Sequence, residues 1–138
     1  MGFSLSDCKI ITPTEIITPG TITISDDGKL AYIGLMENAP NISDPSVDMH
    51  GLILAPGFID IHVHGGNGIS FGRSGMALEE LQAYSKWVVS TGVTGYLCSL
   101  AAPDAKSLVE LVRNYAEIMN ADFEGAEPRK FERSRFHL

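Results

Sequence analysis

The sequence predicts an α/β fold: two strand–helix units of a parallel sheet or of a partial (β/α)8 TIM-like barrel, preceded by part of a small antiparallel β domain. Short β-branched runs separated by turn residues fill the N-terminal part, which favours small strands. Two apolar strands then alternate with two amphipathic helical patterns, an order typical of a parallel sheet. A strand with alternating polar side chains, within residues 56–66, joins the two parts. We therefore expect two domains, residues 1–55 and residues 56–138.

The N-terminal domain is expected to contain antiparallel strands joined by turns. In order, its elements are apolar runs at residues 9–11 and 15–18, a period-two strand at 21–24, a return strand at 30–34 and a last strand at 47–54. Pro19-Gly20 is expected to close the second run, and Asp26-Asp27-Gly28 is a tight-hairpin signal. Residues 38–46 contain prolines, asparagines and an aspartate, which predicts a loop. This domain is expected to be a scaffold for the strand that follows.

The joining strand carries the candidate functional residues. Side chains alternate across a strand, so Asp60, His62 and His64 are expected to share one face. The opposite face would then hold Ile59, Ile61 and Val63 and pack under a helix. Two imidazoles at positions i and i+2 are roughly 6.5 Å apart along a strand, and their nitrogens can converge on one ion at about 2.0–2.1 Å. This predicts a divalent-metal site at His62 and His64, whereas the alternative is a histidine pair that binds nothing.

Two amphipathic helices are expected after this strand. The first spans residues 77–90, is stopped by Gly92, and has the apolar stripe Leu78, Leu81, Tyr84 and Val88. A continuous apolar run at residues 93–101 predicts a strand covered on both faces. The second helix follows Asp104, its expected N-cap, with the stripe Leu108, Leu111, Val112, Tyr115 and Met119. The strand–helix order predicts parallel strands.

The glycine-rich segment from Gly65 to Gly75 is expected to be a loop leaving the strand's C-terminal end. Backbone N–H groups of such loops can hold a phosphate, although this one lacks the lysine and threonine of a nucleotide-binding loop. Gly65, Gly66 and Asn67 are therefore candidate substrate contacts. The alternative is a lid or a simple turn, across which Phe71 packs.

Composition narrows the classes of partner. The 138 residues are 44% hydrophobic and carry a net charge of −7, with a pI near 4.9. This acidity argues against nucleic acid or an anionic membrane as the main partner. Cys8 and Cys98 lie far apart and fit no metal-ligand spacing. No apolar run approaches the length of a membrane span, so we expect a soluble cytoplasmic protein with a small-molecule substrate.

The segment Pro-Gly-Phe-Ile-Asp-Ile-His-Val-His-Gly, residues 56–65, resembles the first barrel strand of the amidohydrolase superfamily of metal-dependent hydrolases. Residues 65–71, 92–97 and 101–104 make the chain most similar to the N-acetylglucosamine-6-phosphate deacetylase family, over residues 10–127. This resemblance implies metal-dependent hydrolysis of the acetamido group of N-acetylglucosamine 6-phosphate to glucosamine 6-phosphate and acetate. His62 and His64 would ligate the metal, with zinc as the expected ion. We expect Asp60 to be a structural carboxylate, or one that contacts a metal ligand, and not the general base.

The resemblance also implies residues that have no counterpart in this sequence: a ligating glutamate after the third strand, two further histidines and a general-base aspartate. We expect Arg135-Phe136-His137-Leu138 to begin the third strand, or else to be a tail from an altered reading frame. The 138 residues alone are expected to be inactive, and a completed chain to be active. An unpaired parallel edge predicts association with a missing C-terminal half or with a second copy. The alternatives are another amidohydrolase, such as a cyclic amidase, and a non-catalytic truncated product.

Overall fold

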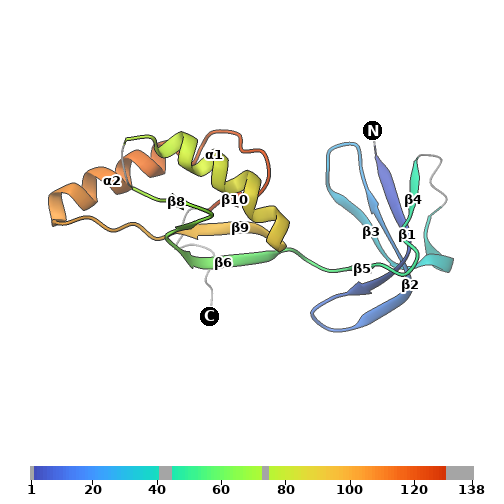
Figure 1. The fold of residues 1–138 in the computed structure, drawn as a ribbon. Helices are drawn as coiled ribbons and strands as arrows, with labels where there is room; N and C mark the ends of the chain where they lie inside the picture. Colours follow the sequence, from blue (N-terminus) through green and yellow to red (C-terminus); the bar gives the residue numbers. More distant parts are fainter. Residues whose placement is uncertain (1, 41–44, 73–74, 130–138) are drawn as a thin grey trace. The chain divides into compact units, whose positions relative to one another are not determined.

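The computed structural model describes residues 2–40, 45–72 and 75–129 (Figure 1). The chain divides into two compact units, Met1–Pro56 and Gly57–Leu138. The first unit is built on β-strands, and the α-helices of the described residues lie in the second. The fold is therefore mixed α/β.

The first unit is a mixed sheet with the strand order β3-β2-β1-β4, in which β5 also pairs with β1. Its elements are β1 (Phe3–Ile11), β2 (Ile16–Ile24), β3 (Leu30–Leu35), the 3-10 turn η1 (Met36–Asn38), β4 (Ser46–Asp48) and β5 (Ile53–Leu54). The strands β1, β2 and β3 are antiparallel, as expected, and the predicted hairpin turn joins the last two. The strands β4 and β5 run parallel to β1, so the expectation of a purely antiparallel domain is wrong.

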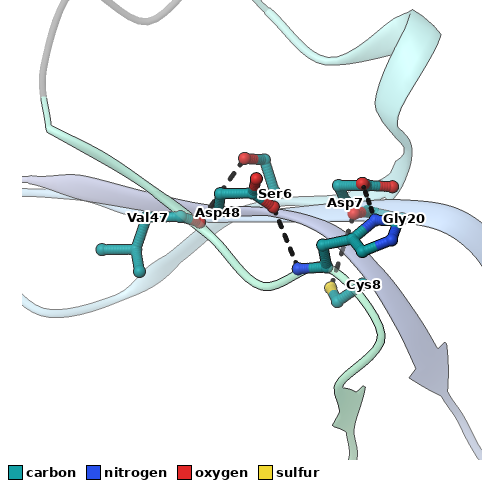
Figure 2. A network of polar contacts seen from close by, with 7 residues as sticks. Ser6, Asp7, Cys8, Gly20, Val47 and Asp48 are labelled. Carbon is teal, nitrogen blue, oxygen red and sulfur yellow. Dashed lines mark hydrogen bonds and ion pairs between the residues drawn. The ribbon is translucent and has the colours of Figure 1, made fainter.

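Two further sequence expectations for this unit need correction. Pro19-Gly20 does not end a strand, because β2 continues through both residues. The pairing of β2 with β1 is irregular there and contains register shifts. Close packing requires glycine at position 20, where a Cβ would lie 2.6 Å from the Ile10 side chain. The single strand expected at 47–54 is two short strands, because Asp48 accepts a hydrogen bond from the His50 N–H in the turn between them (Figure 2).

The second unit contains the predicted strand–helix alternation. Its elements are β6 (Phe58–Val63), the hairpin of β7 (Gly65–Gly66) and β8 (Ile69–Ser70), α1 (Ala77–Val88), η2 (Val89–Thr91), β9 (Val93–Cys98), α2 (Ala105–Ile118) and β10 (Glu127–Pro128). The strands β10, β9 and β6 form a parallel sheet in that order, and α1 and α2 lie over one of its faces (Figure 1). The strand expected at Arg135–Leu138 lies outside the described residues.

Helix boundaries follow the local signals in the sequence. Gly92 adopts the left-handed conformation, with φ of 85°, directly after η2 and supplies the predicted stop. Asp104 is the N-cap of α2, and its carboxylate accepts hydrogen bonds from the N–H and the hydroxyl of Ser107. These two predictions are confirmed.

The core between sheet and helices is strongly aromatic. It consists of Phe71, Ala77, Leu81, Tyr84, Val88, Tyr96, Tyr115 and Ala126. The Tyr96 hydroxyl lies 2.8 Å from the Ser85 hydroxyl, so the fully buried phenol has a polar partner. Two members of the predicted stripes, Leu78 and Val112, are instead exposed, because the buried arc of each helix is narrower than its apolar arc.

No helix in the described part of the chain is long and apolar enough to cross a membrane.

Candidate metal site

A β-bulge in β6 decides where the candidate residues point. Asp60 is in register with Tyr96, and Val63 is in register with Cys98, so three steps along β6 match two along β9. A regular ladder would pair His62 with Cys98, on the face covered by the helices. The extra residue instead brings Val63 to that position, where it packs against the core. Bulges of this kind redirect side chains next to functional sites.

His62 lies on the open side of the sheet, next to the end of the neighbouring strand. Its ring Nδ1 is 3.1 Å from the hydroxyl of Ser99, the residue that follows β9. The Ser99 N–H also donates a hydrogen bond of 2.8 Å to the Val63 carbonyl, which fixes Ser99 beside β6. His62 is an exposed residue.

The rings of His62 and His64 are adjacent. Their centroids are 5.1 Å apart and their planes meet at 82°. A zinc-bound imidazole places its centroid roughly 3.2 Å from the ion, so two such rings at a tetrahedral angle are roughly 5.2 Å apart. The separation of the pair therefore fits two ligands of one ion.

Asp60 does not share the face of the two histidines, and that expectation is wrong. Its register partner Tyr96 is fully buried under α1. Burial, and to a lesser extent the negative charge of Asp60, raise the pKa of Tyr84, another phenol of this core. Asp60 Oδ1 accepts a 3.0 Å hydrogen bond from the His62 N–H. The carboxylate thus contacts the backbone of His62 within the bulge, and it does not form a three-residue metal-binding group with the two histidines of the described structure.

The apolar residues of β6 also depart from simple alternation. Only Val63 packs against the aromatic core, while Ile59 and Ile61 are 52% and 75% exposed. Phe58, at the start of the strand, is 70% exposed. The bulge removes the strict period-two pattern from which a continuous apolar face was expected. The sheet consequently has an open, partly apolar side.

The glycine-rich segment is a tight hairpin in its first half. Gly65 pairs with Ser70 and Gly66 with Ile69, so Asn67 and Gly68 form a two-residue turn, with φ of 51° and 81°. Asn-Gly is the strongest short hairpin signal, and it could have been read from the sequence. A Cβ at position 66 would lie 2.8 Å from the Trp87 ring, so this glycine permits close packing on α1. Substrate contact by Gly65, Gly66 and Asn67 stays a prediction.

The end of this segment is held by a small polar network. The N–H of Gly72 donates to the Tyr115 hydroxyl at 2.7 Å, and that hydroxyl donates to Glu80 Oε2 at 2.8 Å. Phe71 is 6% exposed, and its ring packs on those of Tyr84 and Tyr96. The chain that leaves His64 is therefore tied to both helices.

Among the described residues, no group of three or more His, Cys, Asp or Glu side chains is arranged to hold a metal ion. Cys98 is in register with Val63, but burial raises the pKa of its thiol to about 12, and it packs against the core. His50 lies in the first unit, where its Nδ1 is paired with Asp7 Oδ2 at 2.7 Å. Among the described residues, the two adjacent imidazoles are therefore the candidate metal ligands, and they would fill half of a usual tetrahedral set.

The chain is similar in sequence to two curated deacetylases, and no family model matches it. It is 28% identical over 118 residues to N-acetylglucosamine-6-phosphate deacetylase of Haemophilus influenzae, covering 83% of this chain and 30% of that protein. It is 26% identical over 113 residues to the enzyme of the same name from Bacillus subtilis, covering 82% of this chain and 28% of that protein. The resemblance predicted from the sequence is confirmed, and the chain spans less than a third of either relative.

Solved structures with a similar fold include molinate hydrolase, with a TM-score of 0.63 and 19% identity over 92% of this chain and 29% of that chain. Another is ochratoxinase from A. niger, with a TM-score of 0.57 and 14% identity over 92% of this chain and 30% of that chain. At these identities the likeness concerns the fold alone.

Proposed function

We propose that this chain supplies the first metal-binding strand of a (β/α)8 amidohydrolase that removes acetate from N-acetylglucosamine 6-phosphate. The observation that carries the proposal is the adjacent pair of His62 and His64 at the C-terminal end of a parallel strand, the end at which barrel enzymes place their sites. The sequence similarity to the two deacetylases favours this substrate over others.

Each residue of the strand has a defined part in this proposal. His62 and His64 would hold a divalent ion, with zinc as the expected metal because paired imidazoles suit it. Asp60 keeps the His62 backbone in the bulge through its 3.0 Å hydrogen bond, and so aims the ring at the open face. When bound, such an ion polarises a scissile carbonyl and lowers the pKa of a water molecule.

The remaining ligands and the general base would come from sequence that corresponds to the rest of the relatives. We propose that the 138 residues alone do not turn over, because the described residues supply no third ligand near the pair. Partner segments would extend the parallel sheet at its two edges, β10 and β6. A cytoplasmic location, an anionic sugar substrate and self-association stay predictions.

A chimaera tests the activity. Residues 1–129 would be joined to the part of the Haemophilus influenzae deacetylase that follows its matched region, and acetate release from N-acetylglucosamine 6-phosphate would be measured with zinc present. We expect release that is lost in His62→Ala and His64→Ala, and none from the 138-residue chain. Circular dichroism and bound zinc would first establish that the chimaera is folded and loaded. A folded, loaded chimaera that opens hydantoin or dihydroorotate and spares the sugar would contradict the proposal in favour of a cyclic amidase.

A further inference from the structure

Ser99 is placed to control the ring of His62. The serine follows β9, and its N–H is fixed to the Val63 carbonyl of β6 at 2.8 Å. From this position its hydroxyl reaches His62 Nδ1 at 3.1 Å. Ser99 is half-buried, and the contact joins the ends of β6 and β9.

A hydroxyl beside a histidine nitrogen can set the tautomer of the ring. If the hydroxyl accepts, Nδ1 carries the proton and Nε2 keeps a lone pair; if it donates, Nε2 carries the proton and cannot bind a metal. Metal-binding histidines generally donate their second ring N–H to a neighbouring oxygen, which fixes both tautomer and orientation. Because Ser99 occupies the Nδ1 side, Nε2 is the nitrogen left for an ion.

We propose that Ser99 is a positioning residue for His62: its hydroxyl accepts the Nδ1 proton and so presents the Nε2 lone pair at the open face of the sheet. This inference deepens the proposed function and rests on it for the identity of the metal ligand. It assigns His62 two oriented contacts from different elements. One is the Asp60 carboxylate on its backbone N–H, and the other is the Ser99 hydroxyl on its ring.

The tautomer of His62 can be observed without activity. Two-bond proton–nitrogen correlation spectra of the 138-residue chain with nitrogen-15-labelled histidines would be recorded well above neutral pH, where imidazoles are uncharged. His62→Gln assigns the resonances. We expect the Nδ1–H tautomer in the wild type, its loss in Ser99→Ala and its retention in Ser99→Thr, which keeps the hydroxyl. Ser90→Ala is the matched control, since Ser90 is exposed and bonded to the Trp87 carbonyl.

Zinc titration of the same samples separates the two proposals. We expect Ser99→Ala to weaken zinc binding by about 10-fold, and Ser99→Thr and Ser90→Ala to leave it near the wild-type value. An Nε2–H tautomer in the wild type, or an Nδ1–H tautomer that survives Ser99→Ala, overturns the assignment of Ser99. If the tautomer responds as expected but zinc shifts no histidine resonance in any variant, the metal site fails while the serine–histidine contact stands.

Discussion

The parallel sheet of the second unit has two unlike faces. On one, Leu81 and Tyr96 are fully buried, and α1 and α2 cover an aromatic core. On the other, Ile61 is 75% exposed, and the His62 and His64 rings lie side by side in the open. The bulge in β6 separates them, because it assigns Val63 to the packed face and the histidines to the open one. The side chains that stabilise the fold and those that form the candidate site therefore lie on opposite faces of β6 and β9. Substitutions on one face should change stability, and substitutions on the other should change metal binding.

The largest difference in stability is expected between two alanine substitutions, one of an aliphatic side chain on the packed face and one on the open face. Leu81→Ala leaves a cavity in the aromatic core and should lower the free energy of unfolding by about 2–5 kcal/mol. Ile61→Ala removes a side chain that is already mostly in water, so its effect should stay within about 0.5 kcal/mol. Urea denaturation of both variants measures the difference. Similar losses would mean that the open face is covered in solution.

A smaller effect is expected where the glycine-rich segment is tied to the helices. Tyr115→Phe keeps the ring packing and removes the hydroxyl bonded to both Gly72 and Glu80, leaving only the direct 3.3 Å bond between those two, and should lower the free energy of unfolding by about 1 kcal/mol. Tyr32→Phe is the control, because its hydroxyl donates to Leu35 O at an exposed site and should cost less than about 0.5 kcal/mol. Equal costs would show that the network does not anchor the segment.

The smallest effect concerns the histidine outside the site. The Asp7 carboxylate, hydrogen-bonded to His50, raises the pKa of that imidazole above its ordinary value, with the charge of Asp48 adding to the effect (Figure 2). The resulting stabilisation is present below about pH 6.5 and is lost as the pH rises through the folded-state pKa. In an NMR titration, the His50 midpoint should lie above 6.5 and fall toward that value in Asp7→Asn. An unchanged midpoint in the variant would show that the pair does not form in solution.

The elements of the packed face could be predicted from sequence because each depends on local signals. Gly92 ends the first helix region, Asp104 caps the second helix, and Leu81 and Tyr84 recur at helical spacing. The exposure of Leu78 and Val112 could not be predicted in the same way, since it depends on how much of each helix the sheet covers. The parallel pairing of β4 and β5 depends on contacts with β1 that are distant in sequence.

The candidate site was predictable only as a histidine pair. Period-two alternation predicted that Asp60 shares the face of the histidines. The bulge between Asp60 and Val63 places them on different faces, and no residue type in the strand indicates that bulge. Nothing in the sequence around Ser99 indicates a contact with His62, because that contact depends on Ser99 lying at the end of β9, beside β6. The carboxyl ends of adjacent parallel strands lie at the same edge of a sheet, so the residues that follow the second strand were the place to look for partners of His62.

The most direct test of the central claim is zinc binding by the purified 138-residue chain, compared with a variant in which His62 and His64 are both alanine. We expect the wild type to take up zinc, the double variant not to do so, and both to have the same free energy of unfolding without metal. His50→Ala should bind zinc as the wild type does, because His50 is paired with Asp7 in the other unit. Absence of zinc uptake by the wild type, or equal uptake by the double variant, would contradict the assignment of these two histidines as a metal-binding pair.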